Sequence, residues 1–348
     1  MRSPYTAVLI VPTGVAATMG GYAGDALPIA RAIAQVADTL ITHPNVMNGA
    51  QLYWPLPNGL YVEGYGLDQF AAGRWGLRPV HCNRIGLILD AGIEEYLRYR
   101  HLQAADAARA TLGLAMTDYV VTDAPVNVTL KTAVSGSSWG TVSDSGTLLR
   151  AAEKLMGIGA EAIAVVVRFP DDEDSEALQN YRQGQGVDPL AGAEAVISHL
   201  VVRAFQVPCA HAPALQPLPL DPALSPKSAA EEIGHTFLPC VLAGLSRAPQ
   251  FITDPISSPN ALWRDQVDAV IVPATACGGS GVLSLSSTQA QIIAVEENDT
   301  ALSVSPEQVG IGAIRVRSYL EAIGVMAAHK AGISSAAIAP KVLPLKSA

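Results

Sequence analysis

Two glycine-rich segments are the first places in this sequence where chemistry could be built. PTGVAATMGGYAGDALP follows the apolar run AVLIV (7–11), and CGGSGVLS follows DAVIVPA (268–274). In both, a strand pattern leads through glycines into a helix, an order that lets backbone N–H groups face an anion. We expect both loops to contact a small anionic or nucleotide-like ligand. The loop residues assigned to this contact are Thr13, Gly14, Gly20, Gly21, Thr275, Gly278, Gly279, Ser280 and Gly281.

The second loop is similar to a dinucleotide-binding fingerprint, with one departure. Glu296 ends the next strand pattern, QIIAVE (291–296), where an acid would bind ribose hydroxyls. Ser284 replaces the glycine that packs the helix in that fingerprint. Because ligands bind at strand ends in open α/β sheets, we expect Glu296, Glu297 or Asn298 to contact the ligand. A solvated loop is the alternative.

Three residues are candidates for catalysis. His43 follows the strand pattern TLIT (39–42) and could act as a general base, because histidine titrates near neutral pH. Asp25 could be a site acid or a helix cap. Cys277 could be a nucleophile, because a thiol beside a helix start has a lowered pKa. The structural alternatives are a histidine bonded in a turn and a small buried cysteine. Asn45 and Asn48 follow His43 and are expected to bind the ligand.

Other patterns narrow the chemistry. The sequence has no H-E-x-x-H, no G-x-S-x-G and no paired-cysteine zinc spacing, so we expect no metal site, and no cofactor is identified. In SPKSAAEEIGHTFLP, Lys227 could meet an anion, with Glu231, Glu232 and His235 at helical spacings. A helix start with a solvated acidic first turn explains the same residues.

Composition limits the partners and the location. The net charge is −9 and the basic residues are scattered, which excludes the charge pattern of a nucleic-acid binder. No apolar run approaches the ~18 to 20 residues that span a bilayer, so no membrane is expected. The start MRSPYTAVLIVPTG lacks a secretory pattern, and the four cysteines are scattered. We therefore expect a cytoplasmic protein that binds a small molecule, with a homo-oligomer left open.

The hydrophobic pattern predicts an α/β fold. Apolar strand patterns alternate with helix patterns, which is typical of βαβ units and a mainly parallel sheet with helices on both faces. At 348 residues the chain is long enough for two lobes. We expect an N-terminal α/β lobe (1–170), an irregular, helical and proline-rich insert or cap (171–259), and a C-terminal α/β segment (260–348) that packs with the N-terminal lobe.

Four long strings carry a resemblance to a known family. They are PTGVAATMGGYAGDALPIAR, THPNVMNGAQLYWPLPN, EEIGHTFLPCVLAGLSRAPQF and the segment from GGSG to IIAVEEN. With these strings the chain resembles domain-of-unknown-function family 3326 of photosynthetic bacteria and plastids. The resemblance spans nearly the whole chain and implies no mechanism. A second similarity, at the level of fold alone, is to two-lobed acyl- and phosphate-transfer enzymes. It depends on the string LILDAG, the long helix that follows it, and the string ATLG.

These observations predict a ligand in a crevice between two lobes, at the carboxyl ends of the strands. The preferred hypothesis is a metabolic enzyme, a transferase or an oxidoreductase, in which the glycine loops hold an anion and His43 moves a proton. One alternative is a non-catalytic sensor or regulatory protein for the same kind of ligand. Another is a scaffold without a pocket.

Overall fold

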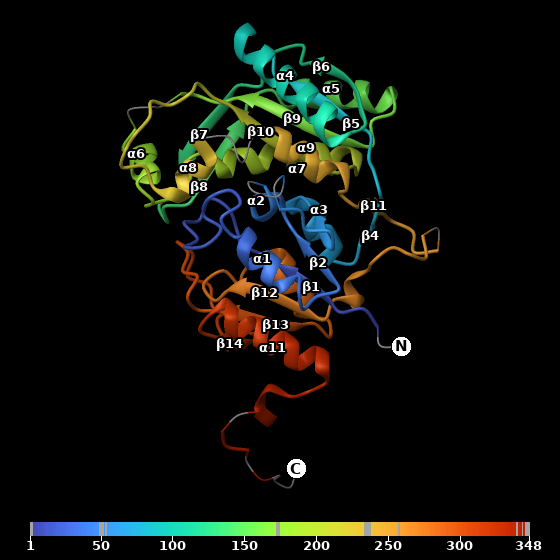
Figure 1. The fold of residues 1–348 in the computed structure, drawn as a ribbon, viewed down its shortest axis with the longest axis vertical. Helices are drawn as coiled ribbons and strands as arrows, with labels where there is room; N and C mark the ends of the chain where they lie inside the picture. The colour runs from blue at the N-terminus through green and yellow to red at the C-terminus, as the bar shows by residue number, and fades with distance from the viewer. Residues whose placement is uncertain are drawn as a thin grey trace.

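Two parallel sheets, each in its own lobe, form the protein. The computed structural model describes residues 3–48, 52, 54–171, 175–232, 238–256, 258–338, 340–342 and 344. Within these residues, strands from the two ends of the chain build the lower lobe of Figure 1, which we call the terminal lobe. Strands from the middle of the chain build the upper lobe, which we call the middle lobe. The α/β class with a mainly parallel sheet, expected from the sequence, is confirmed.

The terminal lobe has a six-stranded sheet in the order β14-β13-β12-β1-β2-β3, and all its neighbours pair in parallel. Its strands are β1 (Thr6–Leu9), β2 (Thr39–Thr42), β3 (Gly59–Tyr61), β12 (Ala269–Pro273), β13 (Gln291–Val295) and β14 (Ile314–Val316). Strands β1 and β12 are buried at every position, because both faces of the sheet are covered. Helices α1 (Leu27–Ile33) and α11 (Tyr319–Ala331) cover one face, and α3 (Gly64–Ala71) and α10 (Ser280–Leu285) cover the other.

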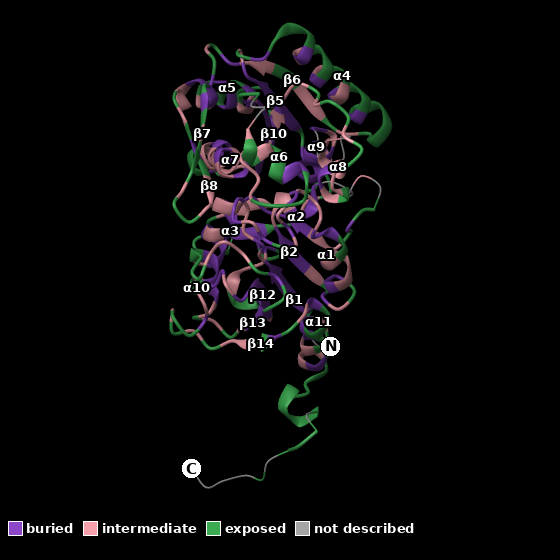
Figure 2. Ribbon diagram, turned by 90° about the vertical axis from the view of Figure 1, so that its left-hand side faces the viewer, coloured by how far each residue is buried: buried purple, intermediate pink, exposed green. Residues whose placement is uncertain are grey.

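The middle lobe has a four-stranded parallel sheet in the order β10-β9-β5-β6. Its strands are β5 (Ile85–Leu89), β6 (Met116–Val121), β9 (Ala162–Arg168) and β10 (Cys209–Ala214). Helices α4 (Glu95–Leu112) and α9 (Leu238–Ser246) cover one face, and α5 (Ser145–Gly157) and α7 (Ala191–Phe205) cover the other. Figure 2 shows buried residues concentrated in the sheets and an exposed outer side on α4.

Three smaller units complete the middle lobe and its links to the terminal lobe. The hairpin of β7 (Val128–Thr132) and β8 (Ser138–Val142) packs on α7. Short helices α6 (Glu176–Arg182) and α8 (Pro226–Glu232) lie beside each other. The chain passes between the lobes twice, and the two passages pair as antiparallel strands, β4 (Gly76–Arg78) with β11 (Gln250–Ile252).

The strand pairing divides the chain differently from the expected boundaries. Residues 260–348 do contribute strands to the sheet of the N-terminal segment. Strand β10, in the segment expected to be an irregular insert, instead pairs with β9 across the expected boundary at residue 170. The prolines around β10 had indicated an extended connection, but Pro213 lies inside this edge strand, where a missing N–H costs little. No helix in the described part of the chain is both long and apolar enough to cross a membrane.

Candidate functional site

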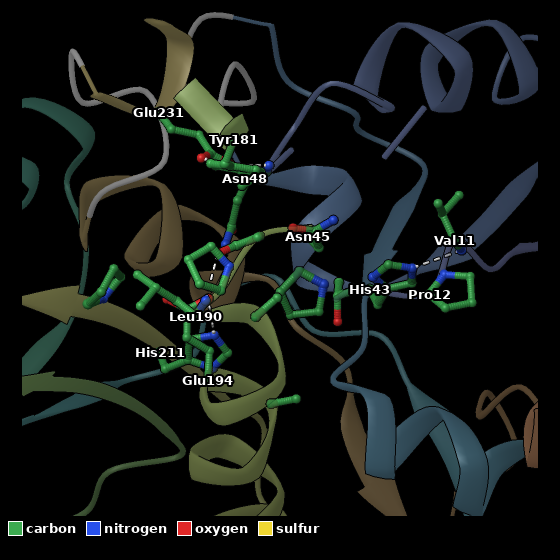
Figure 3. A pocket seen from close by; sticks show the side chains of 18 of the residues that line it. Val11, Pro12, His43, Asn45, Asn48, Tyr181, Leu190, Glu194, His211 and Glu231 are labelled. Atoms are coloured by element: carbon green, nitrogen blue, oxygen red, sulfur yellow. Dashed lines mark hydrogen bonds and ion pairs between the residues drawn. The ribbon is translucent and has the colours of Figure 1, made fainter. Parts of the chain in front are cut away.

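A cavity of about 880 Å³ lies between the two lobes. On the terminal-lobe side, its wall is formed by residues that follow the carboxyl ends of β1, β2, β3 and β12. On the middle-lobe side, the wall comes from α6, α7, β10 and α8. Figure 3 shows His43 and Asn45 on the terminal-lobe side and Glu194 and His211 across from them. A volume of this size accommodates a small organic molecule.

His43 is fixed in the terminal-lobe wall by the end of β2. It is an extended residue directly before the short helix α2 (Pro44–Met47), and its Nε2 accepts a hydrogen bond from the Val11 backbone N–H at 3.1 Å (Figure 3). Burial lowers the pKa of His43 to about 4. The imidazole is therefore neutral at pH 7 and carries its proton on Nδ1, because Nε2 is the acceptor. A neutral His43 with its proton on Nδ1 can donate a hydrogen bond to a ligand, and its expected role as a general base stays a prediction.

Asn48 and Asn45 lie in the same wall, but their side-chain amide groups differ in their hydrogen-bond partners. The Asn48 side chain accepts a hydrogen bond from the Tyr61 hydroxyl at 2.9 Å, and the residue is only 9% exposed. Among the described residues no partner is found for its Nδ2, which leaves an amide donor at the cavity. The Nδ2 of Asn45 instead donates to the carbonyl of Gly20 at 2.8 Å. Asn48 can therefore bind a ligand with its amide, whereas Asn45 holds the first glycine loop.

The middle-lobe wall carries a row of acids around one histidine. Asp188 precedes α7 and accepts a hydrogen bond from the Leu190 N–H at 2.8 Å. On α7, Glu194 and Ser198 lie one turn apart, and His211 of β10 lies between their side chains. Its Nε2 is 3.6 Å from Glu194 Oε2, and its Nδ1 is 3.1 Å from Ser198 Oγ. The group can therefore hold a ligand hydroxyl and exchange protons with it.

Glu231 of α8 extends this acidic wall. The Tyr181 hydroxyl lies within hydrogen-bond distance of both its carboxylate oxygens, at 2.9 and 2.8 Å. Burial, followed by the charge of Asp188, raises the pKa of Glu231 well above its usual range. Burial, followed by the charge of Glu194, raises the pKa of Asp188 to about 7. Neighbouring carboxyls in such a site share protons, because full ionisation would place like charges together.

The cavity lining is acidic as a whole. Its carboxylate residues are Glu63, Asp68, Asp188, Glu194, Asp221, Glu231 and Glu232. Among the described residues, the arginines and lysines that line it are Arg100 and Arg182, and Arg182 is paired with Glu232 at 2.7 Å. An anionic ligand would therefore be repelled. This charge distribution argues against the anionic ligand expected from the glycine loops.

The first glycine loop is filled by the protein itself. The Gly20 N–H donates to Asp25 Oδ1 at 2.6 Å, so this amide is not available to an anion. A Cβ at Gly20 would lie 2.4 Å from the Val11 side chain, and one at Gly21 would lie 2.3 Å from the Ala17 carbonyl oxygen. Of this loop's residues, Pro12, Thr13 and Ala23 line the cavity. The glycines are therefore needed for close packing of the loop.

Gly14 and Asp25, the other assigned residues of this loop, bind the middle lobe. Gly14 has a φ of +69°, and its carbonyl accepts a hydrogen bond from the Ser138 N–H at 2.9 Å. Asp25 lies 3.0 Å from the ammonium of Lys227 and makes no side-chain cap for α1. Burial raises the pKa of Asp25 despite these bonds. It lies outside the cavity lining, so the expected role as a site acid is not supported.

The second glycine loop contributes only its last residues. Gly279, Ser280 and Gly281 line the cavity, whereas Gly278 packs against Val304 and the Thr275 hydroxyl bonds to that of Thr300. Cys277 is fully buried, and burial raises the pKa of its thiol to about 11. The expected nucleophile is therefore a buried thiol, because α10 is short and the apolar core around Cys277 disfavours a thiolate.

The three polar residues after β13 lie outside the cavity lining and fasten other elements. Glu296 pairs with Arg315 at 3.0 Å, and Glu297 accepts a hydrogen bond from the Tyr319 N–H at 2.8 Å. Asn298 is fully buried and bonds to both backbone groups of Met19. Because the middle lobe covers the sheet edge only from β12 to β3, the end of β13 faces no cavity wall.

Sequence reasoning missed most of the acidic wall. Asp188, Glu194 and His211 lie in segments that read as a polar connection, a helix and a proline-rich stretch. Glu231 was noticed but interpreted as solvated, and His235 lies outside the described residues. A polar pair at Glu194 and Ser198, one turn apart on a mainly apolar helix, is the signal that could have indicated a site. Among the described residues, no group of three or more His, Cys, Asp or Glu side chains is arranged to hold a metal ion.

Several contacts join the lobes beside the cavity. Glu63, at the start of α3, lies 2.6 Å from His199 of α7. The ring of Tyr22 stacks on that of Tyr181 with a centroid distance of 4.3 Å, and the Ala23 N–H donates to Glu231. These bonds link the first glycine loop and α3 to the middle lobe. The lobes are therefore held together over the cavity.

The family model described as "Protein of unknown function (DUF3326)" matches residues 6–339. The chain belongs to this family. A relative of this DUF3326 protein from Synechococcus sp. is 63% identical over 335 residues, which cover 96% of this chain and 93% of the relative. Its name is "uncharacterized lipoprotein". The expected cytoplasmic location is contradicted by that name. The expectation depended on the first residues and the scattered cysteines.

One solved structure shares a limited likeness with the DUF3326 chain. It is a periplasmic sugar-binding protein of an ABC sugar transporter from Legionella pneumophila. The alignment covers 70% of this chain and 94% of that chain, with 9% identity and a TM-score of 0.18. A score this low supports no conclusion about fold or ligand.

Proposed function

We propose that this DUF3326 protein binds a small hydroxyl-bearing molecule in the cavity between its lobes. The supporting observation is the opposition of two kinds of hydrogen-bonding groups across the cavity. The terminal-lobe wall presents donors, His43 Nδ1 and Asn48 Nδ2. The middle-lobe wall presents the acceptors of Asp188, Glu194 and Glu231. A hydroxyl group can accept from the first wall and donate to the second.

The energetics of buried polar groups support this choice of ligand. An amide or imidazole donor that is buried without a partner costs about 1–3 kcal/mol. The His43 and Asn48 donors are open to the cavity, and a hydroxyl-rich ligand that displaces solvent from them supplies acceptors that avoid this cost. An anionic ligand would satisfy the same donors but would add its charge to a wall whose carboxyl groups already oppose one another's ionisation. Neutral polyols and monosaccharides are therefore favoured over their phosphates.

Thermal unfolding with matched ligand pairs tests the proposal. The pairs are glucose with glucose 6-phosphate, glycerol with glycerol 3-phosphate, and myo-inositol with an inositol monophosphate. A neutral member present at 100 times its dissociation constant should stabilise the protein by about 2.7 kcal/mol. At the same concentration, the phosphate of that compound should stabilise the protein less. The proposal fails if the phosphates stabilise the protein more, or if neither the neutral polyols nor their amino derivatives stabilise it.

A paired set of variants localises the binding. Glu194→Gln removes a carboxylate from the cavity wall and should weaken the stabilisation by the neutral ligand. Glu296→Gln removes a carboxylate that lies outside the cavity and bonds to Arg315. It should leave ligand binding unchanged. Equal losses in both variants would show that the cavity is not the binding site.

A second candidate function is enzymatic proton transfer on the bound molecule. The observation that favours it is the contact of His211 with both Glu194 and Ser198 in the cavity wall, beside Asp188 with a pKa of about 7. A group that titrates near the working pH can both give and accept a proton. Exchange of carbon-bound hydrogen of the stabilising ligand with deuterated water, followed by NMR, tests this function. A sensor would bind the ligand without such exchange.

The lipoprotein name of the Synechococcus relative supports a setting at a membrane surface for this chain as well. Partitioning of the native protein, extracted from the cells that produce it, between detergent and aqueous phases tests that setting. A lipid-anchored protein enters the detergent phase, and the setting is rejected if the protein stays in the aqueous phase.

A further inference from the structure

We infer that the ligand carries a positively charged amino group, which the acids of the middle-lobe wall hold while Asn48 and His43 bind its hydroxyl groups. The corresponding ligands are amino sugars, aminocyclitols and amino polyols. This inference rests on the proposed function and narrows its ligand class. The charges, the unpaired donors and the cavity volume support it in separate steps.

The first step is the charge balance of the lining. Its titratable and charged groups are His43, Glu63, Asp68, Arg100, Tyr181, Arg182, Asp188, Glu194, His199, His211, Asp221, Glu231 and Glu232. Two acids have close basic partners elsewhere in the wall, Glu232 with Arg182 and Glu63 with His199. Around Asp188, Glu194 and Glu231, the one basic residue of the described lining at hydrogen-bonding or ion-pairing distance is His211, next to Glu194. This part of the wall therefore holds three carboxyl groups and one close basic group among the described residues.

The second step concerns protons. Asp188 and Glu231 have raised pKa values because burial and neighbouring carboxyls oppose their ionisation. A bound ammonium group would favour the ionised carboxylates and lower these pKa values again. Binding of an amine should therefore release protons from the protein at pH 7. Binding of a neutral polyol should release few.

The third step is the buried donor on the opposite wall. Asn48 is only 9% exposed, lines the cavity, and has no partner for its Nδ2 among the described residues. This donor needs an acceptor, which an ammonium group or a metal cation lacks. The cavity of about 880 Å³ is also far larger than a single small cation requires. The two walls together therefore require a molecule with both an amino group and hydroxyl oxygens.

Titration calorimetry with ligand pairs that differ in one group tests the inference. The pairs are glucosamine with glucose, 1-amino-1-deoxysorbitol with sorbitol, and serinol with glycerol. In at least one pair the amine should bind about tenfold more tightly, because a charge-assisted hydrogen bond exceeds a neutral one by roughly 1.4 kcal/mol. Its binding heat should differ between phosphate and MOPS buffers at pH 7, because the buffer takes up the released protons and the two buffers have different heats of protonation.

Two variants distinguish the loss of a carboxylate charge in the cavity from a general effect on the folded protein. Asp188→Asn keeps the shape and an acceptor for the Leu190 N–H, and should reduce the preference for the amine to about twofold or less. Glu296→Gln, outside the cavity, should keep the full preference. If polyols bind as tightly as their amines, the inference is overturned while the proposed function stands. If neither amines nor polyols bind, or if phosphates bind more tightly, both are overturned.

Discussion

His199 of α7 in the middle lobe lies 2.6 Å from Glu63 at the start of α3 in the terminal lobe. Glu63 is buried, and its other carboxylate oxygen accepts hydrogen bonds from the Tyr65 and Gly66 N–H groups. One side chain therefore caps a helix in its own lobe and binds the opposite lobe. Burial opposes the charge of His199, but the hydrogen bond and charge of Glu63 outweigh it and raise the pKa of the imidazole.

This pair predicts a pH-dependent contribution to stability. A histidine with a raised pKa in the folded state stabilises the protein below its ordinary pKa of about 6.5, and the contribution disappears as pH rises through the raised value. Glu63→Gln keeps a cap for α3 but loses the charge. It should lower the free energy of unfolding by about 1 kcal/mol at pH 6 and by little at pH 9. Urea unfolding at both pH values measures this, and an equal loss at both would contradict it.

Asp188 also makes a contribution to the free energy of unfolding that falls as pH rises, but over a lower pH range than the contribution of His199. Its pKa of about 7 in the folded protein, against 3.8 ordinarily, means that the folded state holds the proton more tightly. Its contribution is full below the ordinary value and is lost as pH rises from about 4 to about 7. Asp188→Asn should therefore be more stable than the natural protein at pH 8 by about 1 kcal/mol or more, and similar to it at pH 4. Thermal unfolding across this range checks the result, and parallel curves for the two proteins would refute it.

The two glycine loops should differ in their tolerance of a methyl group. Gly14 has a φ of +69°, and a Cβ there would lie 2.6 Å from Ser138 Oγ in the middle lobe. Gly14→Ala should destabilise the protein by about 1–3 kcal/mol, through backbone strain and loss of the lobe contact. Gly279 has ordinary φ and ψ angles, and a Cβ there would meet nothing within 4 Å. Gly279→Ala is the matched control and should change stability by less than about 0.5 kcal/mol. Comparable losses in both variants would contradict the structure.

Thiol reactivity distinguishes the cysteines. Cys82 is exposed, whereas Cys209, Cys240 and Cys277 are buried, and burial raises the pKa of the Cys277 thiol to about 11. Titration of the native protein with a chromogenic disulfide reagent at pH 8 should detect one fast thiol, which Cys82→Ser removes. All four should react after unfolding in guanidinium chloride. A fast-reacting Cys277 would restore the nucleophile that the structure argues against.

The terminal-lobe wall shows which cavity-lining residues sequence patterns can predict. His43, Asn45, Asn48 and the residues Gly279–Gly281 were assigned from strand ends, and the structure places them together on the cavity. They meet because carboxyl ends of parallel strands lie at one edge of a sheet. Glu296 and Asn298 follow a strand of the same sheet, yet they lie outside the cavity lining because no middle-lobe element covers that part of the edge.

The sequence by itself determined the α/β class, because apolar strands without alternation can be buried only in a sheet covered on both faces. It also determined which glycines and polar residues follow those strands. Only the tertiary structure decided the character of the cavity. Three acids reach it from the middle lobe, Glu194 from α7, Glu231 from α8 and Asp188 from the loop before α7. They face the terminal lobe only because the two lobes lie against each other. The resulting negative charge depends on distances in space, which periodicity and spacing along the chain do not contain.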